Sequence, residues 1–198
     1  MYPLILEETK QNELLLELNF LCNISNYDTI PDYAFANKNL TRVTLPENIK
    51  IIGKGAFKNN QLTSITIPKS VKIIDKEAFR NNKLSTLTLS NSITSIHGAA
   101  FCNNLLSTLT ISNSITSIGA DAFAYNNLTI ITVPINVKSV GSSAFRNNHL
   151  FMVTLSSNDT SFGENVFDDN HPEIDIKNFA FAQISTEENE HQRKKQKL

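Results

Sequence analysis

Hydrophobic residues recur along this chain with a fixed period of 22 residues. Each copy opens with a phenylalanine that follows a small residue, usually alanine, and a leucine stands five residues later in most copies. Further aliphatic columns lie eight, ten, fourteen and seventeen residues after the phenylalanine. The phenylalanines are Phe35, Phe57, Phe79, Phe101, Phe123, Phe145 and Phe167. The pattern predicts short coils that stack, because a single coil cannot bury its own apolar side.

Within each copy, one segment has the alternation that is typical of a β-strand. Ile65 and Ile67 are apolar while Thr66 between them is polar, and most other copies repeat this order. Identical strands of successive coils should pair in parallel and in register, roughly 4.8 Å apart. The return path, such as residues 71–74, is short and β-branched, so we expect a second, weaker parallel ladder there. The three residues that end at each phenylalanine are expected to form a short helical turn.

An asparagine stands three residues after each phenylalanine except the first, where Lys38 takes this place. These residues are Asn60, Asn82, Asn104, Asn126, Asn148 and Asn170. A buried turn leaves backbone N–H and C=O groups that need partners. We therefore predict that each amide bonds the backbone of its own coil and of the adjacent coil, which is a structural role.

The phrase A-F-x-x-N-x-L-x-x-I/V-x-L/I-P, followed by I/V-x-x-I-G, resembles the BspA-like (treponemal-type) leucine-rich repeats over roughly residues 27–171. In that family the asparagine column is often cysteine. The resemblance implies a right-handed leucine-rich-repeat superhelix, α/β by class but rich in β-structure, with a parallel in-register sheet on its concave face. It also implies an adhesion or protein-interaction module, of a kind often found on bacterial surfaces and also in parasitic protists.

Four regions follow from these patterns. Leu14, Leu18 and Leu21 have helical spacing, which predicts a capping helix, with a membrane-surface helix as an alternative that the interspersed glutamates disfavour. Ile174 and Ile176 suggest a last strand. The predicted regions are residues 1–26, an N-terminal helical cap; 27–171, about six to seven coils; 172–185, the last strand and C-terminal cap; and 186–198, a charged disordered tail.

Composition narrows the classes of function. The chain has 198 residues, a net charge of -1 and 40% hydrophobic residues, which argues against a basic nucleic-acid-binding protein. No apolar run approaches the ~20 residues that span a bilayer. The N-terminal residues lack the basic region of a secretory signal peptide, so we expect a cytoplasmic protein or a non-classical export route. Two cysteines without a spacing pattern predict neither a disulfide framework nor a metal site.

No pattern of catalytic residues emerges. The chain has no phosphate-binding loop, nucleophile elbow or zincin motif, and its four histidines are scattered. Residues 168–175 are rich in carboxylates but lack the spacing of an EF-hand loop. We therefore expect a non-enzymatic protein without a cofactor or a bound metal, whose function depends on the shape of its surface.

The predicted partner-binding surface consists of side chains that point outward from the concave sheet. These are Arg42, Thr44, Ser64, Thr66, Thr86, Thr88, Thr108, Thr110, Ile130, Thr132, Phe151, Met152 and Thr154. The threonine column also fits simple β-propensity on a solvated face. Ile130, Phe151 and Met152 are expected to cluster, either as a partner site or as a surface that the last strand or tail covers.

Charge is distributed unevenly along the stack. Three columns of basic residues occur in the second and third coils and form a predicted basic rim: Lys50, Lys54, Lys58, Lys72, Lys76 and Arg80. Such columns are compatible with a solvated rim or with a site for an acidic partner.

Three functions compete at this point. The leading hypothesis is a monomeric scaffold that binds a protein through the concave face, with no nucleic-acid partner and no membrane insertion. A second is a host-directed effector delivered without a classical signal, because residues 193–197 resemble a short nuclear-import signal. A third is an ordered threonine and serine array that binds ice or glycan, suggested by the Thr86/Thr88 and Thr108/Thr110 pairs.

Overall fold

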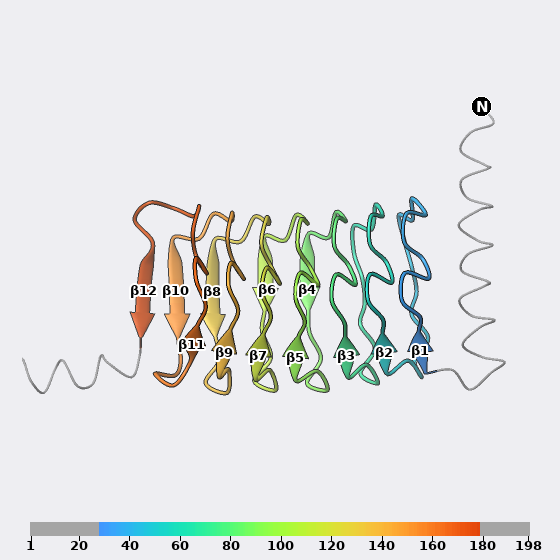
Figure 1. The fold of residues 1–198 in the computed structure, drawn as a ribbon, viewed down its shortest axis with the longest axis horizontal. Helices are drawn as coiled ribbons and strands as arrows, with labels where there is room; N and C mark the ends of the chain where they lie inside the picture. The colour runs from blue at the N-terminus through green and yellow to red at the C-terminus, as the bar shows by residue number, and fades with distance from the viewer. Residues whose placement is uncertain (1–27, 179–198) are drawn as a thin grey trace, which may run out of the picture.

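The computed structural model describes residues 28–178, which form seven coils stacked along one axis (Figure 1). We number the coils by their phenylalanines, from coil 1 at Phe35 to coil 7 at Phe167. The architecture is a parallel β-solenoid, as the period predicts. The predicted capping helix and the charged tail lie outside the described residues. Within the described part of the chain, no helix is long and apolar enough to cross a membrane.

One sheet runs through every coil and is built from the return path. Its strands are β1 (Thr29–Ile30), β2 (Ile51–Ile52), β3 (Ile73–Ile74), β5 (Ser95–Ile96), β7 (Ser117–Ile118), β9 (Ser139–Val140) and β11 (Ser161–Phe162). All pairs are parallel, and Ile52 faces Ile30 on one side and Ile74 on the other. The second residue of each strand from β1 to β9 is buried, which places an aliphatic ladder in the core.

The strands on the opposite path form two shorter sheets. β4 (Thr86–Thr88) pairs with β6 (Thr108–Thr110), and β8 (Ile130–Val133), β10 (Met152–Leu155) and β12 (Asp175–Asn178) form the other. The expectation that the return ladder would be the weaker one is therefore wrong. The return path repeats the same backbone bonds from coil to coil, such as the Asp75 N–H to the Ile52 carbonyl at 2.9 Å, so its pairing is uninterrupted.

The predicted short helical turns are absent from residues 28–178. In coil 2 the residues two positions before and after the phenylalanine, Gly55 and Asn59, have φ of 59° and 56°. Left-handed residues at this spacing prevent a right-handed helix, which needs consecutive negative φ values. Instead the turn bonds to the next coil, for example from the Phe57 N–H to the Ala78 carbonyl at 2.8 Å. We call this six-residue segment, from two residues before to three after the phenylalanine, the phenylalanine turn.

The phenylalanines form a continuous stack through the core. Ring centroids of neighbouring coils are 5.3 to 6.0 Å apart, with interplanar angles of 3° to 15°. The five rings of coils 2 to 6 are fully buried. Burial of a large aromatic side chain and contact with two neighbouring rings both stabilise the stack. The phenylalanine column is therefore structural, as the sequence predicts.

The asparagine column bonds as predicted. In coil 4, Asn104 donates from Nδ2 to the carbonyls of Phe79 and Phe101, at 3.0 and 3.1 Å. Its Oδ1 accepts from the N–H of Leu84 at 3.1 Å. One buried amide thus joins two coils and satisfies backbone groups that water cannot reach.

Coil 7 departs from this pattern. In coils 1 to 6 the leucine five residues after the phenylalanine donates its N–H to the asparagine of the next coil, as Leu150 does to Asn170 at 2.9 Å. Coil 7 has Pro172 at this position, which has no N–H to donate. The register also shifts by one residue, because Met152 pairs with Asp175 instead of residue 174. Coil 7 is therefore built differently from the coils it stacks on.

Candidate functional site

The outward side chains of β4, β6, β8 and β10, with the equivalent residues of coils 1 and 2, form a surface that we call the threonine face. Twelve of the thirteen predicted site residues lie on it, Phe151 directly precedes β10, and all thirteen are accessible. Arg42, Thr44, Ser64, Thr66, Thr86, Thr88, Thr108, Thr110, Ile130, Thr132 and Phe151 are exposed, and Met152 and Thr154 are half-buried. Thr86 pairs with Thr108 and Thr88 with Thr110, so the hydroxyls form two in-register rows.

Ile130 and Met152 on this face, together with Phe151 directly before β10, make up what we call the apolar patch. Ile130 is directly opposite Met152 in the pairing of β8 with β10. Ile130 is 48% exposed and Phe151 43% exposed, while the same columns in earlier coils contain Arg42, serine or threonine. Large apolar side chains that stay accessible on a polar face are typical of contact sites. The patch is confined to coils 5 and 6.

The last strand lies beside the apolar patch. β12 extends the sheet at its edge, with Asp175 opposite Met152 and Lys177 opposite Thr154. The ammonium of Lys177 and the carboxylate of Asp175 are 3.2 Å apart. Charged residues on an edge strand discourage further strand pairing. The described part of this strand therefore borders the patch and leaves it accessible.

The predicted basic rim is partly neutralised by acids that the sequence pattern did not reveal. Glu77 bonds Lys58 at 2.7 Å and Arg80 at 2.8 Å. Hydrogen bonding from Lys58 lowers the pKa of Glu77, and Arg80 adds to this effect. Asp28 pairs with Lys50 at 3.0 Å, which lowers the pKa of that carboxyl. Three of the six basic residues therefore have an acidic partner.

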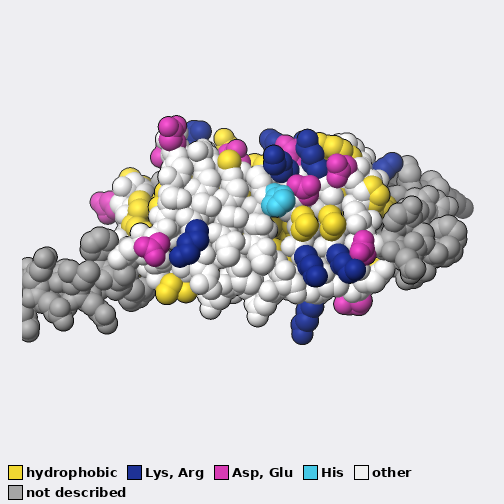
Figure 2. All heavy atoms as spheres, turned by 60° about the horizontal axis from the view of Figure 1, so that its bottom comes forward, with side chains coloured by type: hydrophobic (Ala, Val, Ile, Leu, Met, Phe, Trp, Pro, Cys, Tyr) yellow, Lys and Arg dark blue, Asp and Glu magenta, His cyan; other side chains and the backbone are white. Residues whose placement is uncertain are grey.

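The other three basic residues have a different environment. The Lys54 ammonium lies 5.8 Å from the centre of the Tyr33 ring. Lys72 and Lys76 are exposed, and neither has an ion-pair partner within residues 28–178. In Figure 2, basic side chains gather on the N-terminal half of one face, around exposed hydrophobic side chains, while the C-terminal half is mostly uncharged.

His97 forms an interaction between coils that the sequence pattern does not reveal. Its Nδ1 lies 2.9 Å from a carboxylate oxygen of Asp75 in the preceding coil. Burial would raise the pKa of Asp75, but hydrogen bonds from His97 and from the Lys76 N–H together lower it. This pair joins coil 3 to coil 4, and among residues 28–178 it is not part of any group of three or more metal-binding side chains.

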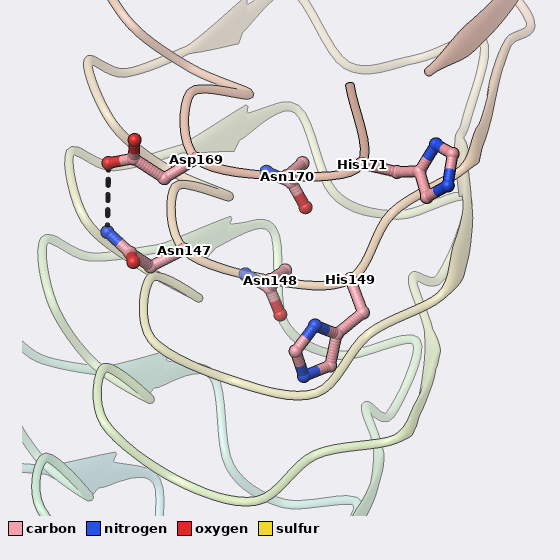
Figure 3. A pocket seen from close by; sticks show the side chains of 6 residues that line it. All are labelled: Asn147, Asn148, His149, Asp169, Asn170 and His171. Atoms are coloured by element: carbon pink, nitrogen blue, oxygen red, sulfur yellow. Dashed lines mark hydrogen bonds between the residues drawn. The ribbon is translucent and has the colours of Figure 1, made fainter. Parts of the chain in front are cut away.

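A shallow cavity of about 300 Å³ lies between coils 6 and 7. It is lined by Asn147, Asn148, His149, Asp169, Asn170 and His171 (Figure 3). Asn147 donates to Asp169 at 3.2 Å on one side, and the two histidines lie on the other. The amides of Asn148 and Asn170 are already bonded to the backbone. No group of three or more metal-binding side chains occurs within residues 28–178.

The cysteine that the structure describes is not a reactive thiol. Cys102 is free and buried, and burial raises the pKa of its thiol. A thiol that stays protonated at neutral pH is a poor nucleophile and a poor metal ligand.

Comparisons with known proteins agree with this geometry. A parallel solenoid with leucine and isoleucine ladders is compatible with a leucine-rich-repeat protein. The model of the BspA type leucine-rich repeat region matches residues 28–150 in six copies, and the chain belongs to this family. A comparison with curated proteins gives no match. Proteins of this family are typically interaction or adhesion scaffolds without enzymatic activity.

Two solved structures share the fold. A leucine-rich repeat protein from Bacteroides ovatus aligns with a TM-score of 0.54 and 21% identity, covering 76% of this chain and 46% of that one. A leucine rich cell surface protein from Faecalibacterium prausnitzii aligns with a TM-score of 0.50 and 28% identity, covering 66% of this chain and 43% of that one. The chain thus spans less than half the length of these two proteins.

Proposed function

We propose that the chain is a non-enzymatic scaffold that binds a protein partner through the threonine face, with the apolar patch at the centre of the contact. One observation carries this proposal: Ile130 and Phe151 are large, apolar and nearly half exposed on a face whose other side chains are mostly hydroxyls. Interfaces commonly place a few apolar or aromatic residues at the centre of a polar rim. Membership of the BspA type family and the likeness to a cell surface protein support an adhesion-type role.

The pairing of β8 with β10 supports a preformed contact site. Ile130 and Met152 are fixed in register by four residue pairs between two parallel strands. The backbone beneath the patch is therefore ordered before a partner arrives, so binding requires little ordering of the scaffold. The threonines beside it, Thr132 and Thr154, can donate and accept hydrogen bonds at the rim.

The test is the double substitution Ile130→Asp/Met152→Asp. A partner captured from cell extract and identified by mass spectrometry is purified, and its affinity is measured by calorimetry. We expect the double variant to lose at least on the order of tenfold in affinity, because carboxylates would be desolvated in the contact. The matched control is Thr86→Asp/Thr108→Asp, which adds the same charges to the same column in coils 3 and 4 and should change affinity far less.

Unchanged affinity of the Ile130→Asp/Met152→Asp variant would contradict the patch as the contact. Circular dichroism shows whether each variant keeps its fold, so that loss of binding is not confused with unfolding. Equal losses in both variants would place the contact along the whole threonine face instead of at the patch.

A hydroxyl array that binds ice or glycan is a second candidate, favoured by the in-register pairing of Thr86 with Thr108 and Thr88 with Thr110. Its repeat along the axis is about 4.8 Å. Thermal hysteresis or binding on a glycan array, lost in Thr86→Val/Thr108→Val, would support it. The effector hypothesis depends on residues 193–197, which lie outside the described residues, and it stays a prediction.

A further inference from the structure

A second surface lies on the long sheet, in coils 2 and 3, on the return path of the coil. There the outward residue of strand β2 is Ile51 and that of β3 is Ile73, paired in register. Ile73 is 38% exposed and Ile51 is half-buried. In the following coils the same position is always a serine: Ser95, Ser117, Ser139 and Ser161. The sequence pattern does not single out this pair, because both isoleucines resemble core residues of a strand.

Lysines stand on both sides of the isoleucine pair. Lys50 and Lys72 precede the isoleucines in their strands, and Lys54 and Lys76 follow three residues later. We call these six residues the lysine–isoleucine patch. Lys72 lies beside Lys50, since its N–H bonds the Lys50 carbonyl at 2.8 Å. Like charges one strand apart are mildly destabilising, so the isolated protein gains nothing from this arrangement.

Acids within the chain compensate the patch only in part. Asp28 pairs with Lys50, and Asp75 is engaged by His97. Lys72 and Lys76 are left without an ion-pair partner among the described residues, on either side of an exposed isoleucine. These two lysines, with an exposed isoleucine between them, would be complemented by a ligand that has an apolar strip with carboxylates on both sides.

We propose that the lysine–isoleucine patch binds an amphipathic α-helix whose apolar stripe is flanked by aspartate or glutamate. Lys76 stands four positions after Lys72, so the Cα atoms of the two lysine rows are at most about 13 Å apart. An α-helix with its side chains is about 10–12 Å wide. A helix that lies with its apolar stripe on Ile51 and Ile73 therefore has both of its flanks within reach of the lysine side chains of the two rows. This surface is independent of the threonine face.

The probes are two labelled synthetic peptides of about five helical turns. Both have leucines at helical spacing, flanked by glutamates in one peptide and by lysines in the other. Fluorescence anisotropy with the full chain should show binding of the glutamate peptide only. Its affinity should fall on the order of tenfold between low and moderate salt, because exposed charge pairs are screened.

Neighbouring coils supply variants that the fold already tolerates. Lys72→Thr/Ile73→Ser gives coil 3 the surface residues of coil 4, which has Thr94 and Ser95. We expect this variant to weaken peptide binding by at least about tenfold. The reverse change, Thr94→Lys/Ser95→Ile, lengthens the patch by one coil and should strengthen binding several-fold.

Lys138→Thr is the matched control, since Lys138 occupies the same column as Lys72 but is followed by Ser139. It should leave the affinity within about twofold of that of the unchanged chain. Equal binding of both peptides, no binding of the glutamate peptide, or unchanged binding by Lys72→Thr/Ile73→Ser would overturn the proposal. Binding to vesicles of phosphatidylserine but not to the glutamate peptide would assign the patch to a membrane surface and also overturn it.

Discussion

Coil 4 and coil 7 contain the same kind of residue at several equivalent positions, yet these residues are buried in coil 4 and partly exposed in coil 7. Phe101 and Asn104 of coil 4 are buried between two neighbouring coils. Phe167 and Asn170 of coil 7 have a coil on one side only within the described chain and are half-buried. Phe162 and Ile176 of coil 7, which continue aliphatic core columns, are 39% and 47% exposed. In a stacked solenoid a residue's contribution depends on its neighbours as much as on its identity.

The phenylalanine column should show the largest difference. Phe101→Ala removes a fully buried ring that stacks on Phe79 and Phe123, at 5.4 and 5.7 Å. We expect its free energy of unfolding to fall by about 3–5 kcal/mol. Phe167→Ala should lose clearly less, since its ring has one stacked neighbour along the column. Urea denaturation of both variants measures the difference, and equal losses would contradict a coil-by-coil account of stability.

The asparagine column should show the next largest effect. Asn104→Ala leaves the buried N–H of Leu84 without its acceptor, and such a group costs about 1–3 kcal/mol to leave unsatisfied. The Phe79 and Phe101 carbonyls each lose one of two amide donors and keep those of Asn82 and Asn126. Asn170→Ala should cost less, because its amide bonds lie in a half-buried site that water can enter. Thermal unfolding compares the two. A larger loss for Asn170→Ala would mean that coil 7 is held more tightly than its exposure indicates.

An ion pair between inner coils should stabilise the protein more than an ion pair at coil 7. Glu77 pairs with Lys58 and so joins coils 2 and 3, and its side chain is 22% exposed. Asp169 pairs with Arg146 and so joins coils 6 and 7, and its side chain is 52% exposed. Glu77→Gln should lower stability at neutral pH by up to about 1 kcal/mol. The lowered pKa of Glu77 means that this stabilisation is present above its ordinary value of 4.5 and disappears as the pH falls through the lowered one.

The pH dependence of this effect can be checked directly. Thermal unfolding of Glu77→Gln and of the unchanged chain should converge as the pH falls below the lowered pKa of Glu77, where the carboxyl is protonated. Asp169→Asn should change stability less than Glu77→Gln at neutral pH. A difference that persists at the acidic end would show that Glu77 acts through packing and not through its charge.

Pro172 should give the smallest effect. Pro172→Ala restores an N–H at a position that no following coil occupies within the described residues, so the change should stay within about 0.5 kcal/mol. Chemical denaturation is the measurement. A loss above this limit would indicate that the proline ring itself supports the end of the stack.

Much of the architecture could be predicted because the 22-residue period repeats a single structural solution. The core columns, the parallel register and the amide bonds of Asn104 all follow from the repeat. The turn geometry could not, since left-handed backbone at Asn59 and at Tyr125 involves different side chains with the same φ. A pattern of residue types does not distinguish a helical turn from alternating left-handed residues that bond the next coil.

The candidate site was only partly predictable for a related reason. The outward residues of the threonine face follow from strand alternation, and Ile130 and Met152 stand out there as apolar residues in a polar column. Ile73 does not stand out, because its neighbour Ile74 is a core residue of the same type. The neutralising role of Glu77 depends on contacts across coils, 19 residues apart from Lys58, which one-dimensional patterns do not reveal.

The phenylalanine turns have an electrical consequence. From coil to coil their N–H groups point toward the C-terminal neighbour, as from Phe79 to the Ala100 carbonyl and from Phe101 to the Ala122 carbonyl. Peptide dipoles that point the same way add, as they do in a helix, and the donor end is the positive pole. Glu164, Asp168 and Asp169 supply negative charge on the last turn, much as acidic residues do at the start of a helix. Other backbone N–H groups of each coil point toward the preceding coil, as from Asp75 to the Ile52 carbonyl, so this polarity belongs to the column of phenylalanine turns and not to the whole solenoid.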